Sequence, residues 1–214
     1  MIHWKTVNGL LRETLLLLMK SKEFDKFRLV GGTALSLQLG HRISVDIDLF
    51  TDAEYGSIDF DIIEEFLAVN FNYVDKDFGT ITGMGKSYLI GTDQDNSIKL
   101  DLYYTTDPFM DPPIVTEEVR MASLEEIIAM KIDVIQRIGR KKDFWDIYEV
   151  LPRYSIANMI ALHERRYKYS HDETLIKTNF TNFVDADGDF EPICLRGYYW
   201  ELIKEDISEA VIRG

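Results

Sequence analysis

Residues 27–50 read FRLVGGTALSLQLGHRISVDIDLF, and the expected fold of the chain starts from this stretch. Its first four residues predict a short strand, which the pair Gly31-Gly32 ends. Residues 33–39 predict a helix, because they are mostly apolar and a glycine follows them directly. Residues 44–50 predict a second strand, since apolar and acidic side chains alternate along it. A strand, a glycine turn, a helix and a second strand therefore follow one another here.

The hydrophobic pattern outside this stretch predicts helices and strands in the first half of the chain and helices alone in the second. Ser57, Ser123 and Ser155 are expected to cap the helices that follow them, and Glu126 completes a capping-box pattern with Ser123. We expect strands at 71–77, 80–90 and 97–104 and helices at 3–20, 57–70, 123–139, 143–151, 155–168, 171–182 and 197–212.

Near residues 111–122 the pattern changes from mixed helices and strands to helices alone, and we expect the boundary between two domains there. Residues 1–115 are predicted to form an α+β core with a mixed sheet and an N-terminal helix. Residues 116–214 are predicted to form a helical domain. The length of 214 residues suits either one large domain or two small ones.

The composition indicates a soluble chain with a packed core and a strong negative charge. Hydrophobic residues make up 46% and charged residues 29%, and 37 acids against 24 bases give a net charge of -13. This charge disfavours passive binding of nucleic acid, because the phosphate backbone is also negative. The single cysteine, Cys194, excludes an internal disulfide and a multi-cysteine metal site. No apolar run reaches the roughly eighteen residues of a transmembrane helix, so we expect a cytoplasmic protein without membrane contact.

Asp46 and Asp48 are the strongest chemical feature of the sequence. Side chains alternate between the two faces of a strand, so these carboxylates share a face. At roughly 4–6 Å and an effective dielectric near 20, their repulsion is on the order of 3 kcal/mol, which a divalent cation such as Mg²⁺ (or Mn²⁺) would relieve. Asp101, in the alternating stretch 98–103, adds a third acid, and three acids on two strands can hold two ions. Taken alone, the first pair fits solvated acids at a strand edge equally well.

The turn Gly31-Gly32-Thr33 precedes the acid pair and offers a place for phosphate. Two glycines permit positive φ and close backbone approach. The helix that follows presents free N–H groups and the positive end of its dipole. Thr33 is expected to cap that helix or to contact a phosphate oxygen. By itself, a glycine pair is more often only a tight turn.

Lys131 falls in the middle of the apolar stripe of helix 123–139. A buried ammonium needs an acid beside it or a cleft that holds anions. Asp143 and Asp146 share a face of the next helix, and they are candidates to orient Lys131 or a substrate hydroxyl. The alternatives are that Lys131 extends to solvent and that Asp143 only caps its helix.

Arg140, Lys141 and Lys142 form a dense basic patch in an acidic chain. The patch is a candidate to guide a nucleotide or RNA phosphate to the cleft, although such a run is usually a solvated loop. His41 and Arg42 come directly before the acidic strand. Arg42 is a candidate for a phosphate contact, but we favour a plain turn role for this pair.

At these residues the sequence resembles the nucleotidyltransferases of the DNA-polymerase-β superfamily. More narrowly, it resembles the AbiEii/AbiGii toxin family of abortive-infection and type IV toxin–antitoxin systems. A fourth family motif, an Asp followed five residues later by an Asn, has no clean match, because Lys177 stands at that offset from Asp172. The first motif also has Gly-Gly where family members often have Gly-Ser. The first motif is matched by Gly31-Gly32-Thr33 with Asp46 and Asp48, the second by Lys99 and Asp101, and the third by Glu126, Lys131, Arg140, Lys142, Asp143 and Asp146.

This resemblance implies an α/β-like nucleotidyltransferase core and a C-terminal helical domain, with the active site between them. The implied reaction moves a nucleoside monophosphate from an NTP to an acceptor hydroxyl with Mg²⁺ or Mn²⁺. Asp46 and Asp48 would bind the metals, Asp101 would bind one metal and help to deprotonate the acceptor, and Lys131 would neutralise triphosphate charge. The nucleotide would be bound by Gly31, Gly32, Thr33, Lys99, Arg140, Lys142, Asp143 and Asp146.

The same resemblance implies a toxin, with tRNA or another RNA as a possible acceptor and a cognate antitoxin as a partner. Two alternatives stay open: transfer to a small molecule, as in antibiotic-modifying enzymes, and a non-catalytic nucleotide- or protein-binding module on the same fold. The net charge of -13 mildly favours a small acceptor or a protein partner over a long nucleic acid. A short tRNA end, however, needs few contacts.

Overall fold

The computed structural model describes residues 1–78 and 83–213, and in this part of the chain seven strands form one mixed sheet. Their order is β3-β4-β5-β2-β1-β7-β6. β2 runs parallel to β5 and β1 parallel to β7, and the other neighbouring pairs are antiparallel. The strands are β1 (Arg28–Leu29), β2 (Asp46–Thr51), β3 (Tyr73–Asp75), β4 (Gly85–Gly91), β5 (Ser97–Tyr104), β6 (Ile114–Thr116) and β7 (Val119–Met121).

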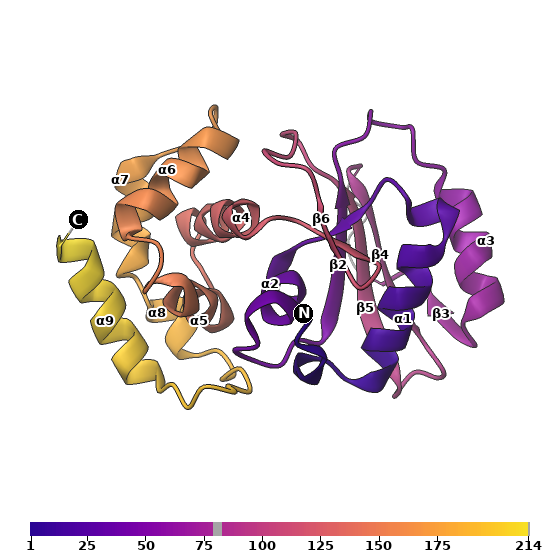
Figure 1. Cartoon of the computed structure of the whole chain (residues 1–214), viewed down its shortest axis with the longest axis horizontal. Coiled ribbons are helices and arrows are strands. Elements are labelled where there is room, and N and C mark those ends of the chain that lie inside the picture. Colours follow the sequence, from indigo (N-terminus) through magenta and orange to yellow (C-terminus); the bar gives the residue numbers. More distant parts are fainter. Residues whose placement is uncertain (79–82, 214) are drawn as a thin grey trace.

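Helices cover both faces of this sheet (Figure 1). α1 and α3 lie on one face and α2 on the other, and the helices after α3 lie beyond α2. α2 packs against α4 and α5, so it joins the sheet to the C-terminal helices. Within the described residues, no helix is both long and apolar enough to cross a membrane. The helices are α1 (Gly9–Lys20), α2 (Gly31–Leu39), α3 (Phe60–Asn70), α4 (Leu124–Gln136), α5 (Lys141–Val150), α6 (Ile156–Arg166), α7 (Glu173–Phe180), α8 (Val184–Asp187) and α9 (Trp200–Arg213), with 3-10 turns at Trp4–Thr6 and Lys22–Phe24.

The expected α+β class, with a mixed sheet and helices at the C-terminal end, is confirmed. The helix expected at 3–20 is wrong at its start, because Asn8 caps α1 by accepting a hydrogen bond from the backbone N–H of Leu11 at 2.8 Å. The strand expected at 80–90 begins at Gly85, and residues 80–82 of it lie outside the described residues. β6, β7 and α8 were not predicted, because elements this short carry almost no periodic signal.

Two of the three expected serine caps are confirmed. The hydroxyls of Ser123 and Ser155 accept hydrogen bonds from backbone N–H groups in the first turns of α4 and α6. Ser57 is not a cap, because Asp59 takes that position in front of α3. The capping box expected between Ser123 and Glu126 is not formed, since the Glu126 carboxylate instead accepts a hydrogen bond from the N–H of Met110 at 2.7 Å.

The pairing of β2 with β5 places acids on neighbouring strands side by side. Asp48 stands opposite Asp101, two residues along from the pair of Asp46 with Lys99. Ile47 and Leu49, which alternate with the acids of β2, are fully buried. The acids therefore share the face away from this core, as the alternation predicts.

One hydrophobic core runs from the sheet into the C-terminal helices. At the junction, Arg166 of α6 forms a buried ion pair with Glu126 of α4, and it donates to the Thr105 hydroxyl at 2.9 Å and to the Pro108 carbonyl at 3.1 Å. β6 spans the expected boundary after residue 115. The division into residues 1–115 and 116–214 stays a prediction.

We expect Arg166→Leu to lower the free energy of unfolding by about 3–5 kcal/mol, because it leaves a carboxylate buried without its cation. Burial already raises the pKa of Glu126 above its ordinary value. Urea denaturation measures the loss. As a matched control, Lys177→Leu removes an exposed pair with Glu173 on α7 and should cost less than about 0.5 kcal/mol. Equal losses in the two variants would contradict the prediction.

Candidate active site

α2 begins at Gly31, directly after β1, and Val30 precedes it as an extended N-cap without a side-chain hydrogen bond. The first N–H groups of a helix have no partner within the helix, and the positive end of the helix dipole lies there. The N–H of Val30 donates to the Asp48 carbonyl at 2.9 Å, which fixes the start of α2 against β2. The helix start therefore offers hydrogen-bond donors to an anion beside the acidic strand.

Gly31 and Gly32 are glycines for two different steric reasons. Gly31 has a φ of +67°, and a Cβ at this position would lie 2.6 Å from Oδ2 of Asp48. A Cβ on Gly32 would overlap Nη2 of Arg42. The pair thus lets a carboxylate and a guanidinium lie directly against the backbone of the turn.

Thr33 is buried and does not cap α2, so the expected cap is wrong. Its hydroxyl is hydrogen-bonded to Oγ of Ser44 at 2.7 Å and donates to the backbone carbonyl of Asp46. Both contacts of the Thr33 hydroxyl are thus with other groups of the protein. Thr33 therefore positions the start of β2.

Asp46, Asp48 and Asp101 gather where β2 meets β5. Burial, with the nearby charges of Asp101 and Asp46, raises the pKa of Asp48 to about 6. Asp101 accepts a hydrogen bond from Oγ of Ser87 at 2.6 Å and pairs with Nζ of Lys99. Burial opposes the charged form of Lys99, but its hydrogen bond to Asp101 and the charges of the three acids raise its pKa. Lys99 therefore compensates part of the negative charge of the cluster.

This set of carboxylates fits a hard divalent cation. Oxygen ligands of this kind are those that Mg²⁺ and Mn²⁺ prefer. A cation between them would relieve the repulsion that, after burial, raises the pKa of Asp48. As the side chains stand, no three His, Cys, Asp or Glu residues within 1–78 and 83–213 form a metal-binding group. The Asp101 carboxylate, the expected third ligand, is paired with Lys99 instead.

Asp146 is fully buried, and three positively charged or ring-nitrogen side chains contact its carboxylate. Nε and Nη2 of Arg42 donate to it at 2.6 and 2.9 Å, and Nε2 of His41 lies 2.8 Å from Oδ1. Nζ of Lys131 lies 2.7 Å from Oδ2 of Asp146 and 2.7 Å from Oδ1 of Asp143. Burial opposes the charged form of Asp146, but Arg42 and Lys131 hold its pKa well below the ordinary value. The plain turn role favoured for His41 and Arg42 is therefore wrong.

Lys131 is held by the acids of α5, as its place in an apolar stripe required. It is buried, so the alternative that it extends to solvent is wrong. Arg140 is the N-cap of α5, and Asp143 lies three residues further on, with Oδ2 3.1 Å from the Arg140 N–H. Asp143 therefore both supports the helix start and binds Lys131, and the alternative that it only caps the helix is wrong.

The three basic residues 140–142 lie in two different environments. Lys141 is buried and donates to the carbonyl of Asp189 at 2.8 Å. Arg140 is exposed, and Nζ of Lys142 lies 3.9 Å from Oδ2 of Asp46. Burial and the charge of Arg140 lower the pKa of Lys142. Two of the three cations thus remain beside the acidic strand.

A cavity of about 300 Å³, which we call the nucleotide cavity, lies between the glycine turn, β2, α4 and α5. In the described structure its lining does not include Thr33, Lys99, Asp101 or Asp146. Asp101 and Lys99 lie on the neighbouring strand, and Asp146 lies behind Lys131. The lining consists of Val30, Gly31, Gly32, Arg42, Ser44, Asp46, Asp48, Phe50, Ile127, Met130, Lys131, Asp133, Val134, Arg137, Arg140, Lys142, Asp143 and Tyr167.

Four polar residues of this lining were not predicted as site residues: Ser44, Asp133, Arg137 and Tyr167. Asp133 pairs with Arg137 four residues along α4, and its Oδ1 lies 3.6 Å from Nε2 of His163. The i, i+4 spacing of opposite charges is visible in the sequence. It predicts an ion pair on a helix but gives no sign that the pair lines a cavity.

The fold is similar to solved structures of nucleotidyltransferases. A putative nucleotidyltransferase from H. pylori is 20% identical with a TM-score of 0.60, over 99% of this chain and 92% of that chain. JHP933 from Helicobacter pylori is 19% identical with a TM-score of 0.61, over 95% and 88%. MenT4, a nucleotidyltransferase toxin from Mycobacterium tuberculosis H37Rv, is 14% identical with a TM-score of 0.59, over 92% and 80%. Because these sequence identities are low, the structural similarity establishes the fold alone.

Sequence comparison extends over most of the chain. An uncharacterized protein from Aquifex aeolicus (strain VF5) is 28% identical over 198 residues, which is 87% of each chain. The model of the family described as "Nucleotidyl transferase AbiEii toxin, Type IV TA system" matches residues 14–204. This range includes the glycine turn, both acidic strands and the helices that carry Lys131 and Asp146. The chain therefore belongs to the AbiEii family of nucleotidyl transferase toxins of type IV toxin–antitoxin systems.

Proposed function

We propose that this protein transfers a nucleoside monophosphate from an NTP to an acceptor hydroxyl and that the transfer requires Mg²⁺ or Mn²⁺. The observation that carries this proposal is the opposition of Asp48 and Asp101 across two parallel strands, beside the glycine start of α2. The carboxylates of Asp46 and Asp48, which suit cations, and the glycine turn, whose N–H groups suit phosphate, line one cavity, and Asp101 lies on the neighbouring strand.

Asp46 and Asp48 would hold the divalent ions, which when bound neutralise phosphate charge and favour ionisation of the attacking hydroxyl. In the reaction the acceptor oxygen bonds to the α-phosphorus, the bond from that phosphorus to the bridging oxygen breaks, and pyrophosphate leaves. Asp101, on the strand beside the pair, takes the proton of the acceptor hydroxyl.

The phosphates lie at the start of α2 in this proposal, where the N–H groups of Gly31 and Gly32 donate to them. Lys131 lines the same cavity and neutralises triphosphate charge. Asp143 and Asp146 hold its ammonium in place at 2.7 Å each. The two acids of α5 thus position a cation instead of meeting the nucleotide themselves.

We also propose that the acceptor is tRNA or another RNA and that a cognate antitoxin is the protein's partner. The family description, which names a type IV toxin–antitoxin system, supports the antitoxin. A net charge of -13 disfavours a long nucleic acid and favours contact through a short end. The same charge supports a second candidate, a small-molecule acceptor. A cytoplasmic location, expected from the single cysteine, stays a prediction.

Incubation with each NTP labelled at the α-phosphate, with Mg²⁺ and either total RNA or small acceptors, tests this function. We expect label in RNA and a loss of about a hundredfold or more in Asp46→Asn, since it removes a metal-binding charge. Asp25→Asn, an exposed acid outside the nucleotide cavity, is the matched control. Label in small acceptors alone would favour the second candidate, and no transfer with any NTP would overturn the proposal.

Asp48→Asn should remove transfer activity yet raise the melting temperature of the metal-free protein above about pH 6. The pKa of Asp48 is raised from 3.8 to about 6, so the folded state loses stability as the pH rises between these values. The full destabilisation is present above the folded-state pKa. In thermal melts with a chelator, the melting temperature of the variant should exceed that of the wild type by more at about pH 8 than at about pH 4.5. A difference in melting temperature that does not change with pH would contradict this prediction.

Gly32→Ala should reduce transfer by about tenfold to a hundredfold, because the new Cβ overlaps Arg42, which two hydrogen bonds to Asp146 hold in place. Overpacking of this kind should also lower the free energy of unfolding by about 1–3 kcal/mol. Gly9→Ala is the matched control, because a Cβ there meets nothing within 4 Å. Single-turnover rates and urea denaturation give the two readouts, and an unchanged transfer rate in Gly32→Ala would contradict the assignment of the turn.

A further inference from the structure

A second cavity of about 310 Å³, which we call the side cavity, adjoins the nucleotide cavity. It lies at the lower end of the size range of about 300–1,000 Å³ that is usual for small-ligand sites. Its own lining adds Ile43, Val45 and residues 189–193. The residues that line both cavities are Arg42, Ser44, Asp46, Arg140 and Lys142.

The loop 189–193, which forms the outer wall of the side cavity, is anchored at both ends. Oδ2 of Asp189 accepts a hydrogen bond from the N–H of Lys141 at 3.0 Å. The carbonyl of Ile193 accepts one from the N–H of Ile43 at 2.9 Å, and the following residue pairs with Arg42 in a short antiparallel bridge. The loop is therefore held against both the start of α5 and the approach to β2.

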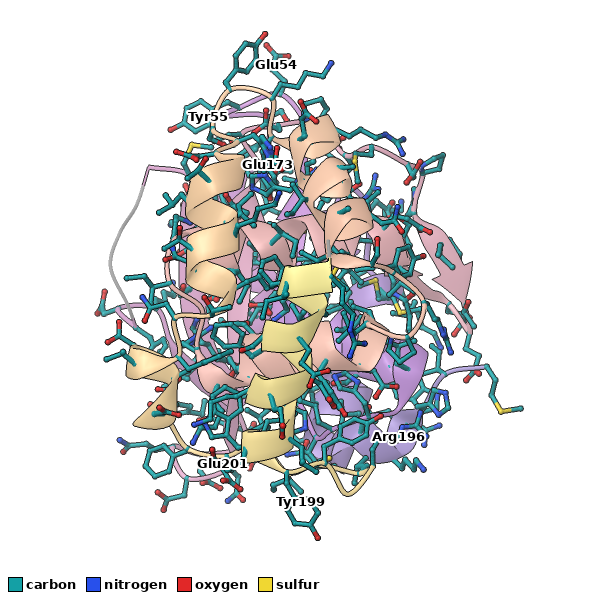
Figure 2. The ribbon with its side chains drawn as sticks, turned by 90° about the vertical axis from the view of Figure 1, so that its left-hand side faces the viewer. Glu54, Tyr55, Glu173, Arg196, Tyr199 and Glu201 are labelled. Carbon is teal, nitrogen blue, oxygen red and sulfur yellow. The ribbon has the colours of Figure 1, made fainter. Side chains whose placement is uncertain are left out.

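Phe190 lies between these two anchors, and its side chain is 100% exposed. Ile193, on the same wall, is 67% exposed. The segment that continues from this loop to α9 runs along one end of the molecule, where Tyr199 projects outward (Figure 2). A fixed loop thus presents a bare aromatic ring at the mouth of a cavity that reaches the acidic strand.

The acceptor hydroxyl has to reach the proposed metal site while the NTP occupies the nucleotide cavity, and the side cavity leads to that site because Asp46 lines both cavities. Its lining combines the exposed aromatic ring of Phe190 with the cations Arg140 and Lys142, which it shares with the nucleotide cavity. An aromatic platform beside cations is the arrangement that binds single-stranded nucleic acid by stacking and phosphate contact. Three acids line the side cavity. Asp46 belongs to the proposed metal site, Asp189 accepts a hydrogen bond at the start of α5, and Glu191 is the third.

We propose that the side cavity binds the terminal nucleotide of a single-stranded RNA acceptor, with its base stacked on Phe190, its phosphate beside Arg140 and its hydroxyl directed to the proposed metal site at Asp46. This inference rests on the proposed nucleotidyl transfer and names the site of its acceptor. An end of a single strand needs only a few contacts, so the net charge of -13 acts against it less than against a long duplex.

The test measures acceptor binding and nucleotide binding separately. A 5′-fluorescein-labelled single-stranded RNA octamer of mixed sequence reports acceptor affinity by anisotropy at low salt, and a fluorescent NTP analogue reports the nucleotide cavity. We expect Phe190→Ala to weaken octamer binding about tenfold, since stacking on an aromatic ring contributes strongly per base, and to leave the affinity for the NTP analogue unchanged. Phe190→Trp should bind the octamer as wild type does.

Tyr169→Ala is the matched control, because Tyr169 is 98% exposed and lines neither cavity. Octamer binding that is equal in wild type and Phe190→Ala would overturn the assignment of the side cavity. Wild type that binds no octamer while it passes label from an NTP to a protein or a small molecule would overturn it as well. Because the octamer assay needs no transfer, failure of the proposed reaction shows in the transfer assay alone.

Discussion

The carboxylate of Asp146 is fully buried, and three parts of the chain that are distant in sequence meet at it. The approach to β2 contributes His41 and Arg42, α4 contributes Lys131, and α5 carries the acid itself. An unpaired buried charge costs several kcal/mol, so these partners have to stay together once the protein folds. Because Arg42 lies against the glycine turn and Lys131 lines the nucleotide cavity, this carboxylate ties the approach to β2 to the helices α4 and α5 at the wall of the site.

The acids of β2 and β5 show the opposite balance, since burial and their mutual repulsion raise the pKa of Asp48. The register of the two strands keeps them together, and buried apolar residues such as Ile47 and Leu100 fix that register. Each fully buried side chain of this size contributes about 1.5–3 kcal/mol, and several of them outweigh a repulsion on the order of 3 kcal/mol. The buried apolar side chains of β2 and β5 thus hold together acids that lower the stability of the fold. Active sites commonly show such a trade-off between stability and activity.

Much of the fold and part of the site could be predicted from local patterns. Alternation along β2 places Asp46 and Asp48 on one face, and the periodicity of α4 requires a partner for Lys131, which Asp143 supplies. The failures have physical causes as well. Thr33 and Ser57 have the chemistry of helix caps, but Thr33 is used by the start of β2 and Asp59 precedes α3. A cap depends on where the chain turns, and residue type alone does not fix that point.

The sequence by itself determined which residues carry charge on which face of each element, because the repeat of a strand or helix assigns faces locally. It thereby determined the acidic strands, the glycine turn and the family. Only the tertiary structure decided that Arg42 and His41 serve Asp146, that Asp133 and Tyr167 reach the nucleotide cavity, and that Phe190 stands at a second opening beside Asp46. These relations join residues about a hundred positions apart, and such pairings follow from how elements pack, which no local repeat encodes.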